Sequence, residues 1–343
     1  MATNSSPLRA LPDDVLQRVL VGIPLDDHRA TASVSRAFHA VVCGPRFLAL
    51  RRQYGFAERG IVVVKNSKDY DHISVVDADI STSISELNYF SHNDSTTDGT
   101  RLLVSIVRNA VPPHVLAVDV SSREWNWSPF GTFGTSRQCK WSPFATLPLN
   151  PLRQYYHCIE WHNGRLYIAG GRTAASHMSN DGEVLNSLHA FNEATGLWEE
   201  LPSMLHGCWA GVSGVIGNRL FIGGGIDVAD LSTLQVYDIA TRTWRLGAPL
   251  PHFGSHAVVT DGKLFVFAKN GPSVMVYDPP SNTWTVEPNY HVEHACVHND
   301  RIVVFSYDGT AYERATDGSW HPYEVAEPGK ARHGRASESV ILG

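Results

Sequence analysis

One unit recurs along most of this chain, and it restricts the possible folds more than any other feature. Each copy has an apolar run, a glycine-containing or polar segment, a second apolar run, a short polar turn and then a tryptophan. The clearest copy is NRLFIGGGIDVADLSTLQVYDIATRTW, at residues 218–244. Related copies end at four other tryptophans, which are Trp125, Trp198, Trp284 and Trp320.

The spacing inside the unit is regular. A large side chain precedes the tryptophan by seven positions in four copies and by eight in the fifth. Apolar runs bounded by Gly, Asp, Asn and Pro predict β-strands, and a period of about 40–50 residues predicts the blades of a β-propeller. One blade cannot bury its faces alone, so blades must pack radially, with large rings in the wedge between neighbours. The spaced pairs are Val118/Trp125, Phe191/Trp198, Tyr237/Trp244, Tyr277/Trp284 and Tyr312/Trp320.

The same pattern predicts six blades, at roughly residues 60–91, 92–140, 150–204, 205–250, 251–288 and 289–325. The first blade has candidate second, third and fourth strands at 60–64, 72–77 and 87–90, but no apolar run precedes them. We therefore expect the C-terminal run 337–342 to supply its innermost strand, which closes the ring and removes two open edges. The segment between Trp127 and Pro151 fits either a loop extension or an outer-strand excursion.

The repeats resemble kelch repeats. The diglycine of that family stands at Gly170–Gly171 and Gly223–Gly224, is degenerate at 268–269 and 305–306, and is absent from the first two units. The resemblance implies a kelch-type propeller over residues 58–343.

The N-terminal part has a different, helical pattern. Residues 1–7 are polar and we expect them to be disordered. Between 8 and 52, apolar residues recur at helical spacing, first in one helix that Gly22 ends and then in a second helix that Gly44–Pro45 breaks, followed by a short third helix. The expected apolar faces contain Val15, Leu16, Val19 and Leu20 in the first helix and Ala30, Val34, Phe38 and Val41 in the second.

This N-terminal part resembles an F-box. The matching stretches are LPDDVLQRVL at 11–20, IPL at 23–25 and VSRAFHAVV at 34–42, although Ser35 and Phe38 stand where the family often has Cys and Trp. The resemblance implies docking on the Skp adaptor of a cullin–RING ubiquitin ligase. The alternative is a helical cap that packs only on itself, but so small a bundle cannot bury all its apolar residues. The candidate adaptor-binding residues are Leu11, Pro12, Val15, Leu16, Pro24, Leu25 and Val34.

Loops at one face of the propeller are the candidate target-binding surface. Strands alternate in direction, so the loop after each second strand and the loop leading into the next blade project from the same face. Aromatic, His and Arg residues gather there, as a protein-recognition surface favours. The candidates are Arg153, Tyr155, Tyr156, Arg172, His177, His206, Trp209, His252, Phe253, Tyr290 and His291.

Three histidines recur just before the first strand of a blade, namely His157, His256 and His294. We expect them to be structural; a metal site is the alternative, without supporting ligand spacing. A propeller enzyme similar to the copper oxidases of kelch-like fold would need Tyr, Cys and His ligands, and only Cys208, Tyr155 and His157 are near candidates. No GxSxG, HExxH, P-loop or CxxC motif is present. We therefore expect no catalytic residue, no metal and no cofactor.

Composition limits the partners and the compartment. The net charge is −6 without an extended basic run, which disfavours nucleic acid. Five cysteines without CxxC spacing fit reduced thiols, and no signal peptide or membrane-spanning run is evident, so we expect a soluble cytoplasmic or nuclear protein. The sequence predicts a mainly β protein, a six-bladed kelch-type propeller preceded by a small all-α F-box bundle. The predicted function is target recognition for a ubiquitin ligase; a kelch interaction scaffold is the alternative.

Overall fold

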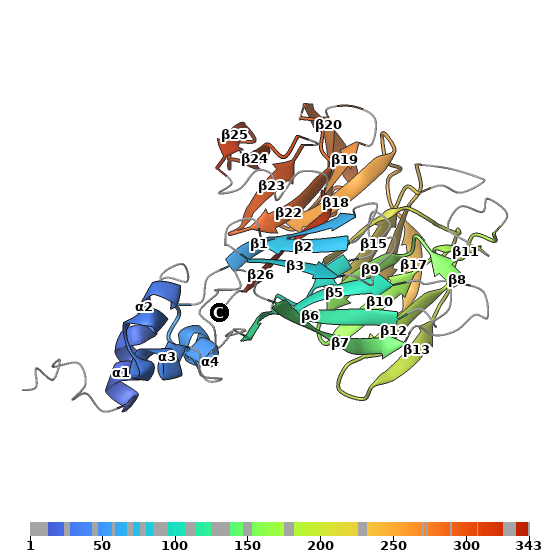
Figure 1. Cartoon of the computed structure of the whole chain (residues 1–343). Coiled ribbons are helices and arrows are strands. Elements are labelled where there is room, and N and C mark those ends of the chain that lie inside the picture. Colours follow the sequence, from blue (N-terminus) through green and yellow to red (C-terminus); the bar gives the residue numbers. More distant parts are fainter. Residues whose placement is uncertain are drawn as a thin grey trace, which may run out of the picture.

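The computed structural model of this 343-residue chain forms four short helices followed by a β-rich body (Figure 1). It describes residues 13–23, 28–42, 47–56, 59–66, 71–75, 80–84, 95–99, 101–106, 114–124, 138–146, 153–174, 182–225, 232–268, 271, 273–288, 290–306, 308–324 and 334–341.

The described strands form six four-stranded antiparallel sheets, which we number as blades in chain order. Blade 1 has β26 (Gly334–Ile341), β1 (Arg59–Asn66), β2 (Asp71–Val75) and β3 (Ile80–Ile84). Blade 2 has β4 (Ser95–Thr97), β5 (Arg101–Ile106), β6 (His114–Glu124) and β7 (Gln138–Thr146). Blade 3 has β9 (Cys158–His162), β10 (Arg165–Ala169), β12 (Leu188–Asn192) and β13 (Leu197–Leu201).

The other three blades follow without interruption by extra strands. Blade 4 has β14 (Val212–Ile216), β15 (Arg219–Gly223), β16 (Leu234–Asp238) and β17 (Thr243–Leu246). Blade 5 has β18 (Gly254–Thr260), β19 (Lys263–Ala268), β20 (Ser273–Asp278) and β21 (Thr283–Pro288). Blade 6 has β22 (His294–His298), β23 (Arg301–Phe305), β24 (Ala311–Arg314) and β25 (Trp320–Tyr323).

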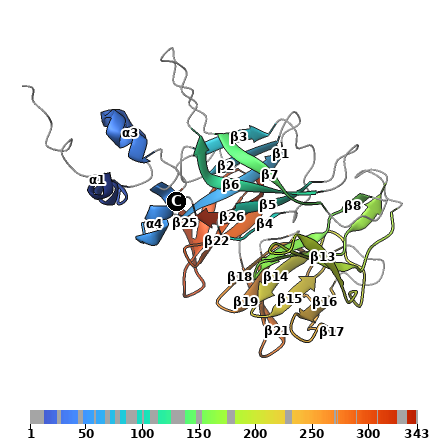
Figure 2. The ribbon, with the colours of Figure 1, turned by 90° about the horizontal axis from the view of Figure 1, so that it is seen from below.

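The blades close into a ring through their innermost strands. β4 contacts β9, and contacts continue through β14, β18, β22 and β26 back to β4. Each innermost strand therefore lies between two neighbours, as in a β-propeller, and a ring of this kind leaves no long sheet edge open at its centre. Figure 2 shows the sheets of the wheel from a second direction, with the helices again to one side.

The C-terminal strand occupies the innermost position of blade 1, as expected. β26 pairs antiparallel with β1 from Arg59↔Ile341 to Lys65↔Gly334, so the strand spans 334–341 rather than 337–342. The first blade thus combines segments from both ends of the propeller, and its closure depends on a strand added last along the chain.

Two outer strands differ from the sequence prediction. The outer strand of blade 1 is β3 at 80–84 and not 87–90, which lies outside the described residues. In blade 2, Val118 of β6 lies opposite Trp141 of β7, not opposite Trp125. The spacing at Val118/Trp125 therefore does not mark a strand pair, and the segment before Pro151 supplies the outer strand.

Three of the predicted ring pairs do form the repeated core contact. Phe191, Tyr237 and Tyr277 lie directly opposite Trp198, Trp244 and Trp284. The ring centroids are 5.3, 5.0 and 5.0 Å apart, within the usual range for packed aromatic pairs. In blade 6, whose spacing is eight, Trp320 lies opposite Arg314 and its ring instead contacts Phe267 of blade 5, at 6.5 Å.

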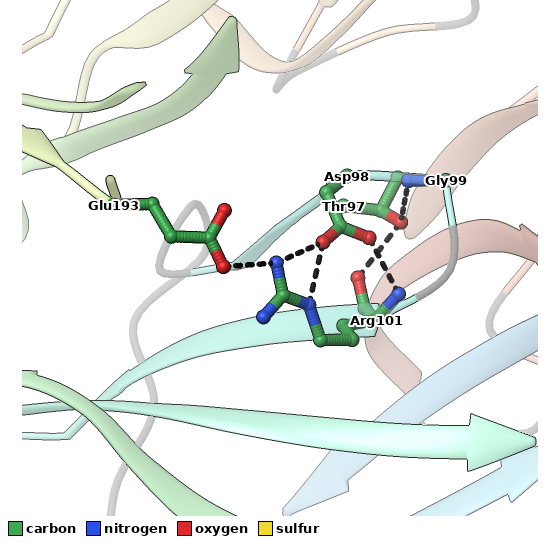
Figure 3. Close-up of polar contacts among 5 residues, drawn as sticks. All are labelled: Thr97, Asp98, Gly99, Arg101 and Glu193. Atoms are coloured by element: carbon green, nitrogen blue, oxygen red, sulfur yellow. Dashed lines mark hydrogen bonds and ion pairs between the residues drawn. The ribbon is translucent and has the colours of Figure 1, made fainter. Parts of the chain in front are cut away.

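Tight turns and ion pairs occupy the face at which first and second strands connect, here called the hairpin face. Asp98 accepts hydrogen bonds from the backbone N–H and Nε of Arg101, both at 2.6 Å, and Thr97 and Gly99 complete the turn. Arg101 also pairs with Glu193 of blade 3 at 2.8 Å, which links two blades (Figure 3). Such partly exposed pairs contribute little stability each, about 0–1 kcal/mol, but they restrict the relative position of the two hairpins.

The helices are α1 (Asp13–Leu20), α2 (His28–Val34), α3 (Arg36–Val42) and α4 (Phe47–Gln53). The expected second helix is thus divided at Ser35, because the Ser35 hydroxyl accepts the Phe38 N–H at 3.2 Å and caps a new helix. The division also places Val34 in solvent, 67% exposed, rather than on one face with Phe38. None of the described helices is long and apolar enough to cross a membrane.

Candidate functional site

The face opposite the hairpin face, here called the mouth, carries the loop that leads from blade 3 into blade 4. This loop, residues 204–211, is bonded to both blades it connects. On blade 3, the Met204 N–H donates to Asn186, the Cys208 N–H donates to Leu185, and the Cys208 carbonyl accepts from Gly171, at 2.7 to 3.1 Å. On blade 4, the Cys208 thiol donates to the Gly224 carbonyl at 3.4 Å. The loop is therefore held between blades rather than projecting freely.

Glycines make this close approach possible. A Cβ atom on Gly170 would lie 2.2 Å from the Cys208 carbonyl oxygen, and Gly170 has a φ of +63°. A Cβ on Gly225 would lie 2.8 Å from both the Cys208 sulfur and the Trp209 carbonyl oxygen, and its φ is +86°. Both positions need glycine for backbone conformation and for space. The glycines seen after the second strands thus leave room for the 204–211 loop.

Three side chains meet at this loop and form what we call the Trp209 cluster: Tyr156, Arg172 and Trp209. The Tyr156 and Trp209 rings pack edge to face with centroids 5.6 Å apart. The Arg172 guanidinium carbon lies 4.9 Å from the Trp209 ring centre, in cation–π range. Tyr156 and Trp209 are each partly exposed, so the cluster presents aromatic surface at the mouth.

The backbone of this cluster is strained at two places. Tyr156 has a φ of +58° and Ala210 a φ of +53°, although neither is Gly, Asn or Asp. Their backbones are joined, because the Ala210 N–H donates to the Tyr156 carbonyl at 2.9 Å. Such conformations cost about 1–3 kcal/mol each and gather at functional sites, where surrounding structure enforces them. The observation favours a functional role for this part of the mouth.

The structure separates the other predicted mouth residues into exposed and packed groups. His206, His252 and His291 are exposed, and Phe253 is half-buried. Tyr290 is 40% exposed but stacks on Tyr312 of β24, with ring centroids 3.7 Å apart.

The remaining predictions concern the segment from 153 to 177. Arg153 and Tyr155 lie in β8 (Arg153–Tyr155), which pairs with β11 (Arg172–Ala174) in a separate two-stranded ribbon. The predicted loop after the second strand of blade 3 therefore begins with a short strand, β11. Arg172 is only 6% exposed and cannot be an open contact residue; its guanidinium packs against the Trp209 ring. His177 lies outside the described residues.

The recurring histidines are buried, as a structural role requires. His157, His256 and His294 are 1, 7 and 0% exposed, and His294 stacks on Phe305 at 4.6 Å. Over the described part of the chain, no group of three or more His, Cys, Asp or Glu residues is arranged to hold a metal ion. Cys158 and Cys208 are buried free thiols; their mutual hydrogen bond and burial raise the pKa of Cys158 well above its usual range. Cys208, the thiol named in the copper-enzyme alternative, donates to the Gly224 carbonyl, a packing role between blades 3 and 4.

One half-buried carboxyl group lies between the innermost strands of blades 3 and 4. Glu160 of β9 accepts a hydrogen bond from the Ser213 hydroxyl of β14 at 2.7 Å. Burial raises the pKa of Glu160 to about 7, and the Ser213 hydrogen bond opposes part of that rise. The carboxyl lies in the ring and not among the mouth side chains, so we assign it to stability.

The helical segment has a complete core and a residual apolar surface. Its core contains Leu16, Leu20, Val21, Ala32, Val42 and Phe47. Leu16 is 3% exposed and belongs to this core, so it is not available as a partner-binding residue. Val15, Val19 and Val34 are 37, 55 and 67% exposed. The predicted residues Leu11, Pro12, Pro24 and Leu25 lie outside the described residues.

The sequence prediction missed one buried polar residue near the mouth. Gln235 in β16 is 3% exposed and bonds to the backbone of His206. The sequence does contain an indication of this residue's role. Gln235 is an amide side chain inside the apolar run LQVYD, and an unpaired polar group in a buried strand would be costly, so a hydrogen-bond partner is expected.

Comparison with known proteins supports the repeat assignment. A Kelch motif matches residues 155–205 and 211–251, which contain all the strands of blades 3 and 4. The chain is similar to Kelch repeat and BTB domain-containing protein 12 of Danio rerio, with 29% identity over 168 residues, 41% of this chain and 27% of that protein. It is also similar to Kelch-like protein 25 of Xenopus tropicalis, with 28% identity over 141 residues, 36% of this chain and 23% of that protein.

An F-box/kelch-repeat protein of Arabidopsis thaliana matches a larger share of the chain. Its identity is 24% over 295 residues, which is 80% of this chain and 71% of that protein. The two BTB- and kelch-type relatives are matched over less than a third of their own length. This chain therefore contains Kelch repeats on a mainly β, propeller-type fold, and its relatives are kelch-containing proteins.

Proposed function

We propose that this chain is the target-recognition subunit of a Skp–cullin–F-box ubiquitin ligase, with the helical segment on the Skp adaptor and the mouth on the target protein. It performs no chemistry itself. It raises the local concentration of a target lysine beside a ubiquitin-charged enzyme, so positioning supplies the rate increase. Cytoplasm or nucleus is the corresponding compartment.

The proposed binding of the Skp adaptor is supported by the apolar surface that remains exposed on the helical segment. Val15 and Val19 are four residues apart on α1 and so share one face, and both remain exposed although the core beneath them is filled. Covering a large apolar side chain contributes about 1.5–3 kcal/mol. The similarity to an F-box/kelch-repeat protein agrees with this assignment. We keep Leu11, Pro12, Pro24, Leu25 and Val34 in the proposed contact set.

Capture by the purified Skp adaptor tests this half. Val19→Asp, alone and with Val15→Asp, should weaken capture at least tenfold, because a charge would have to be buried in the interface. Leu16→Asp is not a usable test, since Leu16 is buried in the helical core. Leu197→Asp is the matched control, because Leu197 is 68% exposed on β13 and should leave capture unchanged. Equal capture by wild type and Val19→Asp would leave the chain as an interaction scaffold without a ubiquitin role.

The mouth half is supported by the partly exposed aromatic pair and the strained backbone that holds it. Proximity labelling in cells should compare the whole chain with a form lacking residues 8–52, from which bound targets are not passed to the ligase. Proteins enriched with the shortened form should disappear when Trp209→Ala is added, because rigid aromatic anchors dominate protein interfaces. Leu246→Ala, an exposed change on β17, is the control. Unchanged enrichment with Trp209→Ala would remove the Trp209 cluster from target binding.

A further inference from the structure

The 204–211 loop carries two of the residues proposed to meet the target, His206 and Trp209, and something must fix their positions. Backbone bonds hold the loop at Met204, Cys208 and Ala210. Between the first two of these, the chain passes His206, whose side chain is exposed. At His206, the backbone of the loop is hydrogen-bonded to a side chain and not to another backbone segment.

That group is Gln235 of β16, in the third strand of blade 4. The His206 N–H donates to the Gln235 Oε1 at 2.9 Å, and the Gln235 Nε2 donates to the His206 carbonyl at 3.0 Å. An N–H can only donate and a carbonyl can only accept, so this arrangement also fixes the orientation of the amide. A buried side chain thus bonds both polar groups of one loop residue, as a neighbouring strand would.

The neighbouring blade holds its own loop in a weaker form of the same arrangement. Tyr237 and Tyr277 each face the tryptophan of their blade, so Gln235 and Met275, two residues earlier, occupy equivalent positions. In blade 5, the His252 N–H lies 3.2 Å from the Met275 sulfur. Met is close to Gln in length and can accept this bond, but it has no N–H to donate to a carbonyl. The residue at this third-strand position therefore bonds to a histidine in the loop that leads into its own blade. Gln235 makes two such hydrogen bonds in blade 4, and Met275 accepts one in blade 5.

We infer that Gln235 is the positioning residue of the target-binding mouth, fixing His206 and, three residues on, Trp209. The identity of the residue at this third-strand position sets how rigidly each leading loop is held. This inference rests on the proposed function only for the biological use of the loop; the positioning itself concerns this chain alone. Pre-organised loops bind more tightly because less freedom is lost on association.

Amide hydrogen exchange on the whole chain tests the positioning. The near-isosteric Gln235→Met should speed exchange at the His206 amide and in its flanking loop by about fivefold, and Gln235→Ala by about tenfold or more, because one and two hydrogen bonds are lost. The His252 amide, whose partner is Met275 of blade 5, should not change. Equal exchange at His206 in wild type, Gln235→Met and Gln235→Ala would overturn the inference.

Target capture then separates this inference from the proposed function. With the labelling assay described above, Gln235→Met should lower enrichment of the Trp209-dependent proteins while the melting temperature stays within a few degrees of wild type. If Gln235→Met loosens the loop but Trp209→Ala changes no enrichment, the positioning stands and the proposed use of the mouth fails. If Trp209→Ala abolishes enrichment and Gln235→Met changes neither exchange nor enrichment, Gln235 is not the positioning residue.

Discussion

One carboxyl group between the innermost strands makes the stability of the propeller depend on pH. The Glu160 carboxyl lies between β9 and β14 with Ser213 as its hydrogen-bond partner, and burial raises its pKa from 4.5 to about 7. Between those two pH values, the folded state keeps a proton that the unfolded chain has released. The stabilising contribution is therefore complete below pH 4.5 and is lost as the pH rises through 7.

Glu160→Gln should remove this dependence, because the amide stays neutral and can still bond to Ser213. At pH 8.5 we expect the variant to be more stable than wild type by about 2 kcal/mol, and at pH 4.5 the two should agree. Urea unfolding at both pH values measures the difference. Glu183→Gln, a change at an exposed carboxyl, should follow wild type at both. A wild-type protein that is no less stable at pH 8.5 than the variant would contradict the assignment.

At the scale of elements, hydrogen bonds from side chains to backbone carbonyls connect separate segments of the fold. The Trp244 and Trp284 N–H groups donate to the carbonyls of Pro202 and Ala248, in the segments that leave the preceding blade, at 2.7 and 2.9 Å. In the helical segment, buried Arg51 of α4 donates to the carbonyls of Val21 and Phe56 at 2.8 and 2.7 Å, and also to the carbonyl of Ile23. Arg51 therefore holds the end of α1 against α4.

Arg51→Leu should destabilise the helical segment by about 2–4 kcal/mol, because buried carbonyls lose their donors. Circular dichroism at 222 nm should show part of the signal melting at a lower temperature than in wild type. The main transition of the propeller should be unchanged, since the carbonyls described as accepting from Arg51 belong to Val21, Ile23 and Phe56 in the helical segment. Gln53→Ala, an exposed change on the same helix, is the control. A single transition identical to wild type would contradict this role.

For the whole molecule, closure of the wheel depends on one strand. β26 pairs with β1 in blade 1 and contacts both β22 and β4, the innermost strands on either side. Its removal would leave β1 as an open edge and separate blade 6 from blade 2. Non-local closure of this kind couples all six blades, because each innermost strand relies on two neighbours.

A chain truncated after residue 333 should melt at least ten degrees lower than wild type or aggregate through its open edge. A synthetic peptide of residues 334–343 should restore the melting temperature in a concentration-dependent way, since added strands stabilise by mass action. A peptide of scrambled order is the control. Full stability of the truncated chain without peptide would show that β26 does not hold the ring closed.

The sequence alone determined the repeat and hence the architecture. Paired ring and tryptophan residues at a spacing of seven predict direct cross-strand neighbours, and Tyr237/Trp244 and Tyr277/Trp284 have this relation. Local patterns suffice because a tight turn fixes the register between third and fourth strands. The need to close the first blade likewise predicted a C-terminal strand. The spacing failed at Val118/Trp125, where a longer connection frees the register and Trp141 takes the place opposite Val118.

Only the tertiary structure decided which candidate side chains are available. Leu16 and Arg172 match their patterns as well as Val15 and Trp209 do, yet both are buried. Gln235 bonds to His206, 29 residues away along the chain, and this contact has no local signature. Strand pairing within a blade depends on residues close together in the sequence, so a periodic sequence pattern can predict it. Contacts at the mouth depend on how separate loops meet after the ring has closed, and periodicity does not specify them.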